Sequence, residues 1–150
     1  MEKEYYMKKA LSYARRAGKM GETPVGAVIV RKGEIISFGY NKRESKKNAL
    51  CHAEIMAINR ACKKLGGWRL WECDMYVTLE PCPMCAGAII NARIKNVYFG
   101  AFDKKAGCFG SITDFNSLSF NHHPKVEGGI LEEESRTLLS EFFKKLRKKI

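Results

Sequence analysis

Apolar residues recur at helical spacing near the start of the chain and then give way to short strand-like runs. Between Glu4 and Gly18, the residues spaced to face a core are Tyr6, Ala10, Tyr13, Ala14 and Ala17. This spacing predicts an amphipathic helix. Two apolar runs follow at residues 25–30 and 34–40, and the Lys32-Gly33 step between them suits a tight hairpin turn. We therefore expect the chain to open with a helix and a β-hairpin.

After a polar loop at residues 41–48, helical and strand-like segments alternate. The next segment predicts a helix from His52 to Leu65, ended by Gly66-Gly67. Its inward-facing candidates are Met56, Ile58, Ala61, Cys62 and Leu65. A strand, a helix, a second strand, a short third strand and a long closing helix are then expected at residues 75–79, 83–92, 96–100, 125–127 and 131–149. Residues 101–123 form a long polar loop of the kind that often carries function.

The alternation of strands and helices predicts an α/β sandwich with a central sheet. No internal repeat, low-complexity tract or linker breaks the sequence. We therefore expect one domain over residues 1–150.

Basic residues outnumber acidic ones by 27 to 16, which gives a formal net charge of +11. Such a surplus in a small protein favours an anionic partner; nucleic acid comes first, with acidic lipid or solubility alone as alternatives. No apolar stretch is long enough for a membrane span, and the first residues do not form a secretory signal. We expect a cytoplasmic protein without a membrane partner.

The chain has six cysteines: Cys51, Cys62, Cys73, Cys82, Cys85 and Cys108. The cytosol would keep them reduced, so metal binding or catalysis explains them better than disulfides. Cys82 and Cys85 alone have the spacing of metal ligands. The other four are expected to be small buried hydrophobic residues or loop thiols.

Two short motifs carry candidate chemistry: His52-Ala53-Glu54 and Pro81-Cys82-Pro83-Met84-Cys85. The two cysteines are three residues apart at a predicted helix start, so both thiols project to one side. The helix N-terminus also favours the thiolate form, which binds metal. His52 can add one imidazole from another helix. Three protein ligands are typical of a catalytic zinc site, which leaves the fourth position for water, whereas a structural site has four.

Each motif alone is a weak signal. A Cys-x-x-Cys pair could be a redox pair or half of a zinc knuckle, and a single His is more often structural. No second pair completes a knuckle, and no thioredoxin-type opening surrounds this one. Together, the motifs match the His-x-Glu and Pro-Cys-x-x-Cys signature of zinc-dependent nucleobase deaminases.

The reaction of such enzymes suggests a role for Glu54. Replacing an exocyclic amine by oxygen needs a nucleophile and protons, and zinc lowers the pKa of its water to roughly 7. A carboxylate beside the ligands can take a proton from that water and pass it on. Glu54 could also be a solvated helix charge, which is uncommon two residues from a ligand. Glu80, the other acid nearby, is interpreted as a structural loop residue.

Several segments resemble the bacterial tRNA adenosine deaminases of the cytidine deaminase superfamily. The likeness is carried by the two motifs within residues 52–57 and 76–87, and it extends to residues 24–28, 99–103, 110–111, 121–122 and 138–143. It implies a three-layer α/β/α sandwich with a five-stranded mixed sheet, usually in a homodimer. It also implies hydrolytic deamination of the wobble adenosine in a tRNA anticodon stem-loop to inosine, with release of ammonia.

The resemblance further implies site roles. His52, Cys82 and Cys85 would bind one zinc ion per subunit, and Glu54 would carry protons. The residues that it places near the substrate are Asn41, Ala53, Asp103, Asn121 and Phe143. Turn or loop-capping roles are the alternatives for Asn41, Asp103 and Asn121. His122 is interpreted as an RNA or structural contact rather than as a further metal ligand.

The closing helix ends in a basic cluster: Lys144, Lys145, Arg147, Lys148 and Lys149. Basic residues commonly complement the C-terminal end of a helix, and the adjacent Phe142 and Phe143 could belong to the core. Two adjacent phenylalanines point in different directions, however, so one is available to stack on an unpaired base. In this family, that helix lies beside the anticodon loop.

Two segments depart from the family pattern. Residues 48–51 read Asn-Ala-Leu-Cys where Asp-Pro-Thr-Ala is frequent, and Phe102 stands where Arg is frequent. Two other functions stay open: a sister deaminase acting on free guanine, cytosine or a nucleotide, and a zinc-stabilised RNA-binding module without activity. The first needs neither the +11 charge nor the basic tail, and the second leaves Glu54 and the three-ligand set unexplained.

Overall fold

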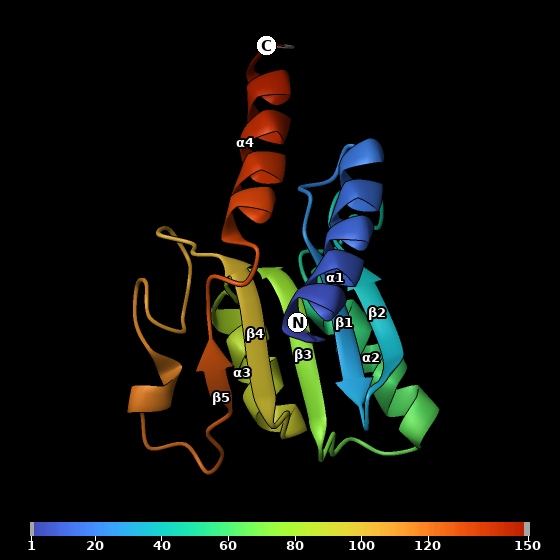
Figure 1. Ribbon diagram of the computed structural model, residues 1–150, viewed down its shortest axis with the longest axis vertical. Coiled ribbons are helices and arrows are strands. Elements are labelled where there is room, and N and C mark those ends of the chain that lie inside the picture. Colours follow the sequence, from blue (N-terminus) through green and yellow to red (C-terminus); the bar gives the residue numbers. More distant parts are fainter. Residues whose placement is uncertain (1, 149–150) are drawn as a thin grey trace.

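The computed structural model describes residues 2–148, which form four α-helices and a five-stranded sheet (Figure 1). The elements in chain order are α1 (Glu2–Lys19), β1 (Gly26–Arg31), β2 (Glu34–Tyr40), α2 (Ala53–Leu65), β3 (Cys73–Leu79), α3 (Pro83–Ala92), β4 (Asn96–Ala101), the short 3-10 helix η1 (Phe115–Ser117), β5 (Lys125–Glu127) and α4 (Glu132–Lys148). Every expected helix and strand is present, with ends that differ by at most two residues. The structure adds η1 within the expected loop, and Lys149 lies outside the described residues.

The sheet is mixed and has the strand order β2-β1-β3-β4-β5. Strand β1 is antiparallel to both β2 and β3, whereas β4 is parallel to β3 and β5. The expected hairpin joins β1 and β2 through Lys32 and Gly33, whose φ angles of 50° and 79° are both left-handed, as this tight turn requires. Because β2, β3 and β4 run in the same direction, all three strands end at the same edge of the sheet.

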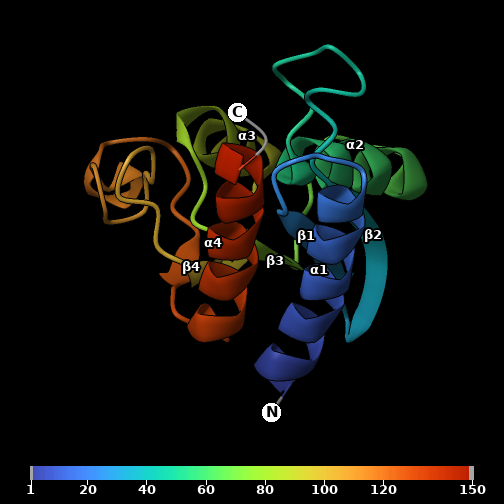
Figure 2. The same cartoon turned by 90° about the horizontal axis from the view of Figure 1, so that it is seen from above.

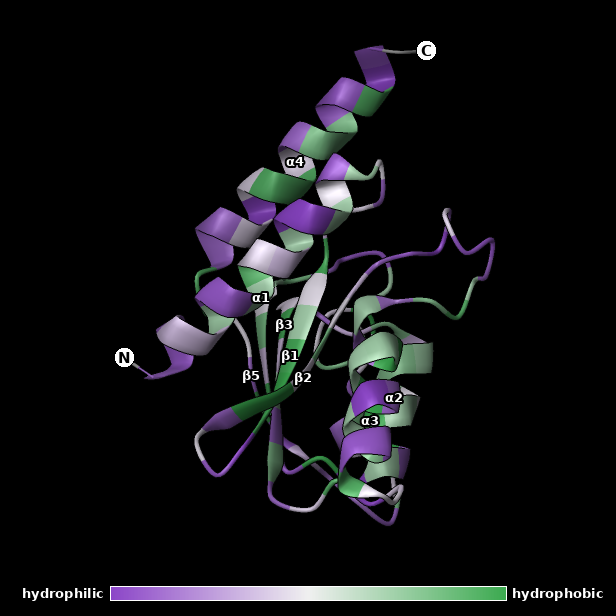
Figure 3. Ribbon diagram, turned by 90° about the vertical axis from the view of Figure 1, so that its right-hand side faces the viewer, coloured by the Kyte–Doolittle hydropathy of each residue, from purple (hydrophilic) through white to green (hydrophobic). Residues whose placement is uncertain are grey.

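Helices cover both faces of the sheet. Figures 2 and 3 show α1 and α4 on one face and α2 and α3 on the other. The side chains of β1 alternate between the two layers: Val28 and Val30 pack with α1, and Ala27 and Ile29 lie in the core on the side of α2 and α3. The expected three-layer α/β/α sandwich is confirmed. Within residues 2–148, no helix is both long and apolar enough to cross a membrane.

Helix α2 packs against the sheet mainly through small residues. Ile58 and Ala61 are buried as predicted, Met56 and Cys62 are half-buried, and Ala57, which was not predicted, is buried as well. The prediction is wrong for Leu65, which is 38% exposed because it is the last residue of the helix. The small side chains let α2 approach the sheet closely, which fixes where its first turn lies.

Candidate active site and metal-binding cluster

Helices α2 and α3 both begin at the edge of the sheet where β2 and β3 end (Figure 1). His52 is the N-cap residue of α2 and Cys82 that of α3, and both have extended backbone conformations. Strand β2 passes so close to the first turn of α2 that a Cβ on Gly39 would collide with the backbone of Ala53 and Ala57. Pro83 fits the first position of α3 because its fixed φ angle suits a helix and it has no N–H to satisfy. These features place His52 and Cys82 opposite each other.

The expected metal ligands lie together. His52 Nδ1 is 3.6 Å from the Sγ atoms of both Cys82 and Cys85, and the three candidate ligand atoms are all within 4.8 Å of one another. One imidazole and two thiolates form a donor set that zinc prefers, and ligands of one zinc ion are spaced in this way when each bond is roughly 2.0–2.3 Å. The cluster therefore fits a metal ion with three protein ligands.

The two thiols differ in protonation when no metal is bound. A hydrogen bond from the Cys85 thiol, helped by His52, lowers the pKa of Cys82 to about 4 despite its partial burial. The same hydrogen bond, together with burial, raises the pKa of Cys85 well above its usual range. Both thiols would lose their protons to a bound metal ion, because the thiolate is the form that binds metal.

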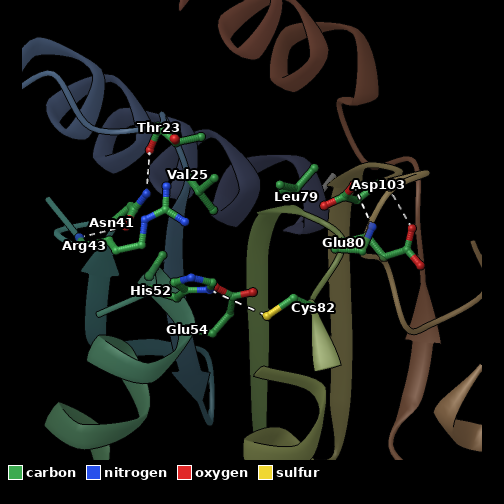
Figure 4. Close-up of a pocket in the computed structure, with 12 residues that line it drawn as sticks. Thr23, Val25, Asn41, Arg43, His52, Glu54, Leu79, Glu80, Cys82 and Asp103 are labelled. Carbon is green, nitrogen blue, oxygen red and sulfur yellow. Dashed lines mark hydrogen bonds between the residues drawn. The ribbon is translucent and has the colours of Figure 1, made fainter. Parts of the chain in front are cut away.

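Glu54 lies between His52 and Cys82 in the first turn of α2 (Figure 4). Its side chain is buried, with 4% of the residue exposed. Burial raises the pKa of Glu54 to about 7. A carboxyl group with a pKa near neutrality can accept and return a proton at physiological pH, which is the property of a general acid and base.

These residues line a cavity of about 230 Å³, which we call the inner cavity. Its lining comprises Thr23, Val25, Asn41, Arg43, His52, Ala53, Glu54, Leu79, Glu80, Cys82, Asp103 and Ala106. Two expected substrate-binding residues, Asn41 and Ala53, are therefore beside the cluster. Asn41 is also a turn residue, because its Oδ1 accepts a hydrogen bond from the Arg43 amide at 3.1 Å, while its Nδ2 donates to the Thr23 carbonyl at 3.4 Å. Both expected roles can coexist at this position.

Asp103 reaches the inner cavity from the loop after β4. Its Oδ1 accepts hydrogen bonds from the amides of Lys105 and Ala106 at 3.0 and 3.2 Å, so it also caps its own loop. The buried Glu80 side chain holds the same loop in place. It is 2% exposed and accepts hydrogen bonds from the amides of Asp103, Phe109 and Ser111. This is the structural loop role interpreted from the sequence.

A larger hollow of about 650 Å³ lies beside the inner cavity and extends to α4; we call it the outer groove. Its lining comprises Thr23, Arg43, Leu79, Ala101, Phe102, Asp103, Lys104, Lys105, Glu132, Arg136, Leu139 and Phe143. Phe143 is 41% exposed, whereas Phe142 is half-buried, as expected for adjacent phenylalanines. Phe102, the departure from the family pattern, is 47% exposed in the same groove.

Asn121 lines neither the inner cavity nor the outer groove. Its neighbour His122 places Nε2 2.6 Å from the carbonyl oxygen of Ile94, just before β4 begins. The active-site residues lie near the other end of that strand. Within one chain, the structure therefore separates Asn121 from the other expected substrate residues and gives His122 a structural contact.

Sequence reasoning did not single out Thr23, Arg43 or Leu79, which line both hollows. They come from the turn before β1, the loop after β2 and the end of β3. No local motif connects these three segments. The sequence offered two signals: the polar loop around Arg43, and the motif within residues 76–87 that contains Leu79.

The family model described as MafB19-like deaminase matches residues 1–147. A tRNA-specific adenosine deaminase of Bacillus subtilis (strain 168) is 50% identical over 97% of this chain and 91% of its own length. That of Aquifex aeolicus (strain VF5) is 51% identical over 100% of this chain and 99% of its own.

Solved structures give the same relation. A structure from a study of A-to-I editing by tRNA:A34 deaminases at the wobble position of transfer RNA has a TM-score of 0.88 and 44% identity, covering 90% of this chain and 99% of that one. A guanine deaminase from Bacillus subtilis has a TM-score of 0.64 and 32% identity, covering 79% of this chain and 86% of that one.

Proposed function

This chain belongs to the MafB19-like deaminase family, and we propose that it hydrolyses the wobble adenosine of a tRNA anticodon stem-loop to inosine, releasing ammonia. The observation that carries the proposal is the inner cavity, where Glu54 lies beside the His52, Cys82 and Cys85 cluster. The choice of substrate is supported by two proteins named tRNA-specific adenosine deaminase, which are 50% and 51% identical to this chain over nearly its whole length.

We infer that the metal ion is zinc, held by His52 Nδ1 and by the two cysteine sulfurs. Imidazole with two thiolates matches zinc better than magnesium or calcium, which prefer oxygen ligands. When bound, zinc would supply a water molecule whose pKa is roughly 7. The chain's residues then have to position the base and move protons.

Glu54 is the residue placed to move those protons. It would take the two protons of the attacking water in turn and deliver the first to the ring nitrogen and the second to the departing amine, so that adenosine and water become inosine and ammonia. Its pKa of about 7, caused by burial, suits both steps. Asn41, with its amide at the wall of the inner cavity, is placed to hydrogen-bond the base, while Ala53 shapes the wall.

The outer groove would accommodate the nucleotides that flank the target base. It offers two exposed aromatic side chains, Phe102 and Phe143, for stacking, and the cations of Lys104 and Lys105 for phosphates. The Arg136 side chain in the same groove pairs with Glu132 and Glu133. A loop base is already partly unstacked, so placing it in the inner cavity costs less than the few kcal/mol needed to extrude a base from a duplex. Binding energy from the flanking nucleotides would position the target ring.

We further propose a homodimer located in the cytoplasm. Helix α3 has no charged residue among its ten positions, and its outward side presents Pro83, Gly87 and Asn91. A helix surface without charge is suited to a protein–protein interface. A tRNA substrate and six unpaired cysteines suit the reducing cytoplasm.

The other deaminase function weighed from the sequence has one supporting observation, namely the 32% identity to a guanine deaminase. A free base would fill the inner cavity but leave the basic and aromatic outer groove unused. A zinc-stabilised RNA-binding module would need neither a buried Glu54 nor an open cavity next to the metal ligands. The first alternative therefore does not explain the outer groove, and the second explains neither the buried Glu54 nor the inner cavity.

The test compares an anticodon stem-loop carrying adenosine at the wobble position with the same loop carrying cytidine, and with free adenosine, guanine and cytosine. Inosine, uridine, xanthine, uracil and ammonia are measured. We expect rapid inosine formation in the adenosine stem-loop and little turnover of the others. Rapid turnover of a free base with no reaction of the stem-loop would refute the tRNA assignment.

A further inference from the structure

The inner cavity and the outer groove meet at a neck. Four residues line both hollows: Thr23, Arg43, Leu79 and Asp103. A substrate that places its base beside Glu54 and its neighbouring nucleotides along α4 must cross this neck. In a nucleic acid strand, the part that crosses is the sugar-phosphate backbone next to the target base.

Arg43 is the only one of the four neck residues with a positive charge. Its Nε atom lies 3.6 Å from a carboxylate oxygen of Glu44, and the two side chains are 49% and 73% exposed. An exposed ion pair of this length is weak and readily replaced. The other charged neck residue, Asp103, already accepts two amide hydrogen bonds within its own loop.

The backbone around Arg43 is fixed although its side chain is exposed. The Arg43 amide donates to Asn41 Oδ1 at 3.1 Å. The amides of Glu44 and Ser45 donate to the carboxylate of Glu22 at 3.0 and 2.7 Å, and Glu22 is only 1% exposed. Figure 4 shows the Arg43 side chain extending past Asn41 towards the cavity, above His52. The loop therefore holds a guanidinium group at the entrance to the catalytic centre.

We propose that Arg43 binds the backbone phosphate next to the target nucleotide, and that this contact selects a nucleotide within a strand over a free nucleoside or base. The inference rests on the proposed deamination of a stem-loop adenosine. A guanidinium group has planar N–H donors that match two phosphate oxygens, and this charge-assisted pairing is stronger than a neutral hydrogen bond. The contact would hold the ribose at the neck while the base enters the inner cavity.

The test is a double-substitution cycle between protein and RNA. Arg43→Gln and the wild-type enzyme are assayed on the adenosine stem-loop and on two versions in which an uncharged methylphosphonate replaces the phosphate on either side of the target nucleotide. We expect the neutral linkage on one side to lower the wild-type kcat/KM by roughly 10- to 100-fold, the effect of removing one hydrogen bond to a charged group. Arg43→Gln should show a decrease of the same size on the normal stem-loop and no further decrease on that neutral linkage.

Arg15→Gln is the matched control, because Arg15 is an exposed arginine of α1 that lines neither hollow. It should keep the wild-type response to both neutral linkages. Zinc content equal to that of the wild type would show that Arg43→Gln leaves the metal cluster intact.

An unchanged kcat/KM for Arg43→Gln on the normal stem-loop would overturn the inference. The inference would also be overturned if the effects of Arg43→Gln and of the methylphosphonate on kcat/KM multiplied whichever of the two phosphates is replaced. The protein change and the RNA change would then act independently. A wild-type enzyme that deaminates free bases but not the normal stem-loop would refute the proposed function itself, and the phosphate contact with it.

Discussion

His52 is the N-cap of α2 and Glu54 lies in its first turn, yet the two side chains face different parts of the cluster. His52 Nδ1 faces both cysteine sulfurs, whereas Glu54 is buried between His52 and Cys82, and burial raises its pKa to about 7. His52 Nδ1 is within hydrogen-bonding distance of both sulfurs, where it can share a metal ion with them. Glu54 is placed to act on what binds in the cavity. Metal binding and proton transfer should therefore be separable by substitution.

The first prediction tests that separation. Cys82→Ser and Cys85→Ser should lose both zinc and activity, because each removes one of three ligands. Glu54→Ala should retain zinc while its turnover falls at least about 100-fold, the lower range for loss of a general acid and base. Metal analysis and turnover are measured on the same samples. Cys62→Ser, a thiol outside the cluster, is the control, and a zinc-free Glu54→Ala protein would contradict the assigned roles.

The second prediction concerns Glu80, which holds the loop that carries Asp103. Glu80→Ala should lower the free energy of unfolding by about 3 kcal/mol or more, because several amides would lose a buried acceptor. Glu34→Ala, at an exposed strand position, should change it by less than about 0.5 kcal/mol. Denaturant unfolding measures both. Equal stabilities for the two variants would show that the carboxylate does not hold the loop.

At the scale of elements, two helix starts and one strand determine the geometry of the site. Helix α2 supplies His52 and Glu54, and α3 follows Cys82 directly. The distance between the two helix starts depends on how closely α2 approaches the sheet. Gly39 permits that approach, since any side chain there would meet the backbone of α2.

The third prediction follows from this close approach. Gly39→Ala should destabilise the fold by about 1–3 kcal/mol, the usual cost of inserting an atom into a packed site, and should weaken zinc binding by displacing His52. Gly67→Ala is the matched control, because a Cβ there would meet no atom within 4 Å. Thermal unfolding and zinc titration are the measurements. A Gly39→Ala protein with unchanged zinc affinity would mean that the first turn of α2 can shift without disturbing the cluster.

The fourth prediction concerns the basic end of α4, which projects beyond the sheet at the same edge as the site (Figure 1). Neutralising Lys144, Lys145, Arg147 and Lys148, with Lys149, should weaken tRNA binding. For every phosphate that is no longer neutralised, the slope of log affinity against log salt should fall by roughly 0.7 to 0.9. Neutralising Lys63 and Lys64 at the end of α2 is the control, since they line neither hollow. An unchanged slope in the α4 variant would mean that this helix end is only solvated.

The spacing of apolar residues was enough to predict where the helices and strands lie. In β1, α1 and α3 the apolar side chains face a hydrophobic core along the whole length of the element. The metal cluster was also predictable, since its ligands sit in two recognisable motifs. The neck was not predictable, because Thr23, Arg43 and Leu79 come from three segments that meet only through sheet pairing and loop packing. The separation of Asn121 from the cavity likewise depends on the course of residues 102–124, which no periodic pattern describes.

At the scale of the whole molecule, the surplus of positive charge and the two connected hollows suggest the same substrate. A net charge of +11 favours an anionic partner such as RNA at long range, where the attraction weakens with salt. We propose that the inner cavity accepts one base and that the outer groove offers aromatic and basic side chains for its neighbours. An adenosine in a flexible loop can satisfy both hollows, whereas one stacked in a duplex stem cannot enter the inner cavity without unpairing.

The most direct test is the position of deamination in a complete tRNA that carries a wobble adenosine. Purified wild-type enzyme, loaded with zinc, is incubated with the unmodified transcript, and inosine is located by sequencing, with Glu54→Ala enzyme as the control. We predict nearly complete conversion at the wobble position, no conversion of the other adenosines and none with the control. Inosine scattered over other adenosines, or no inosine in the tRNA while free guanine is consumed, would contradict the proposed function.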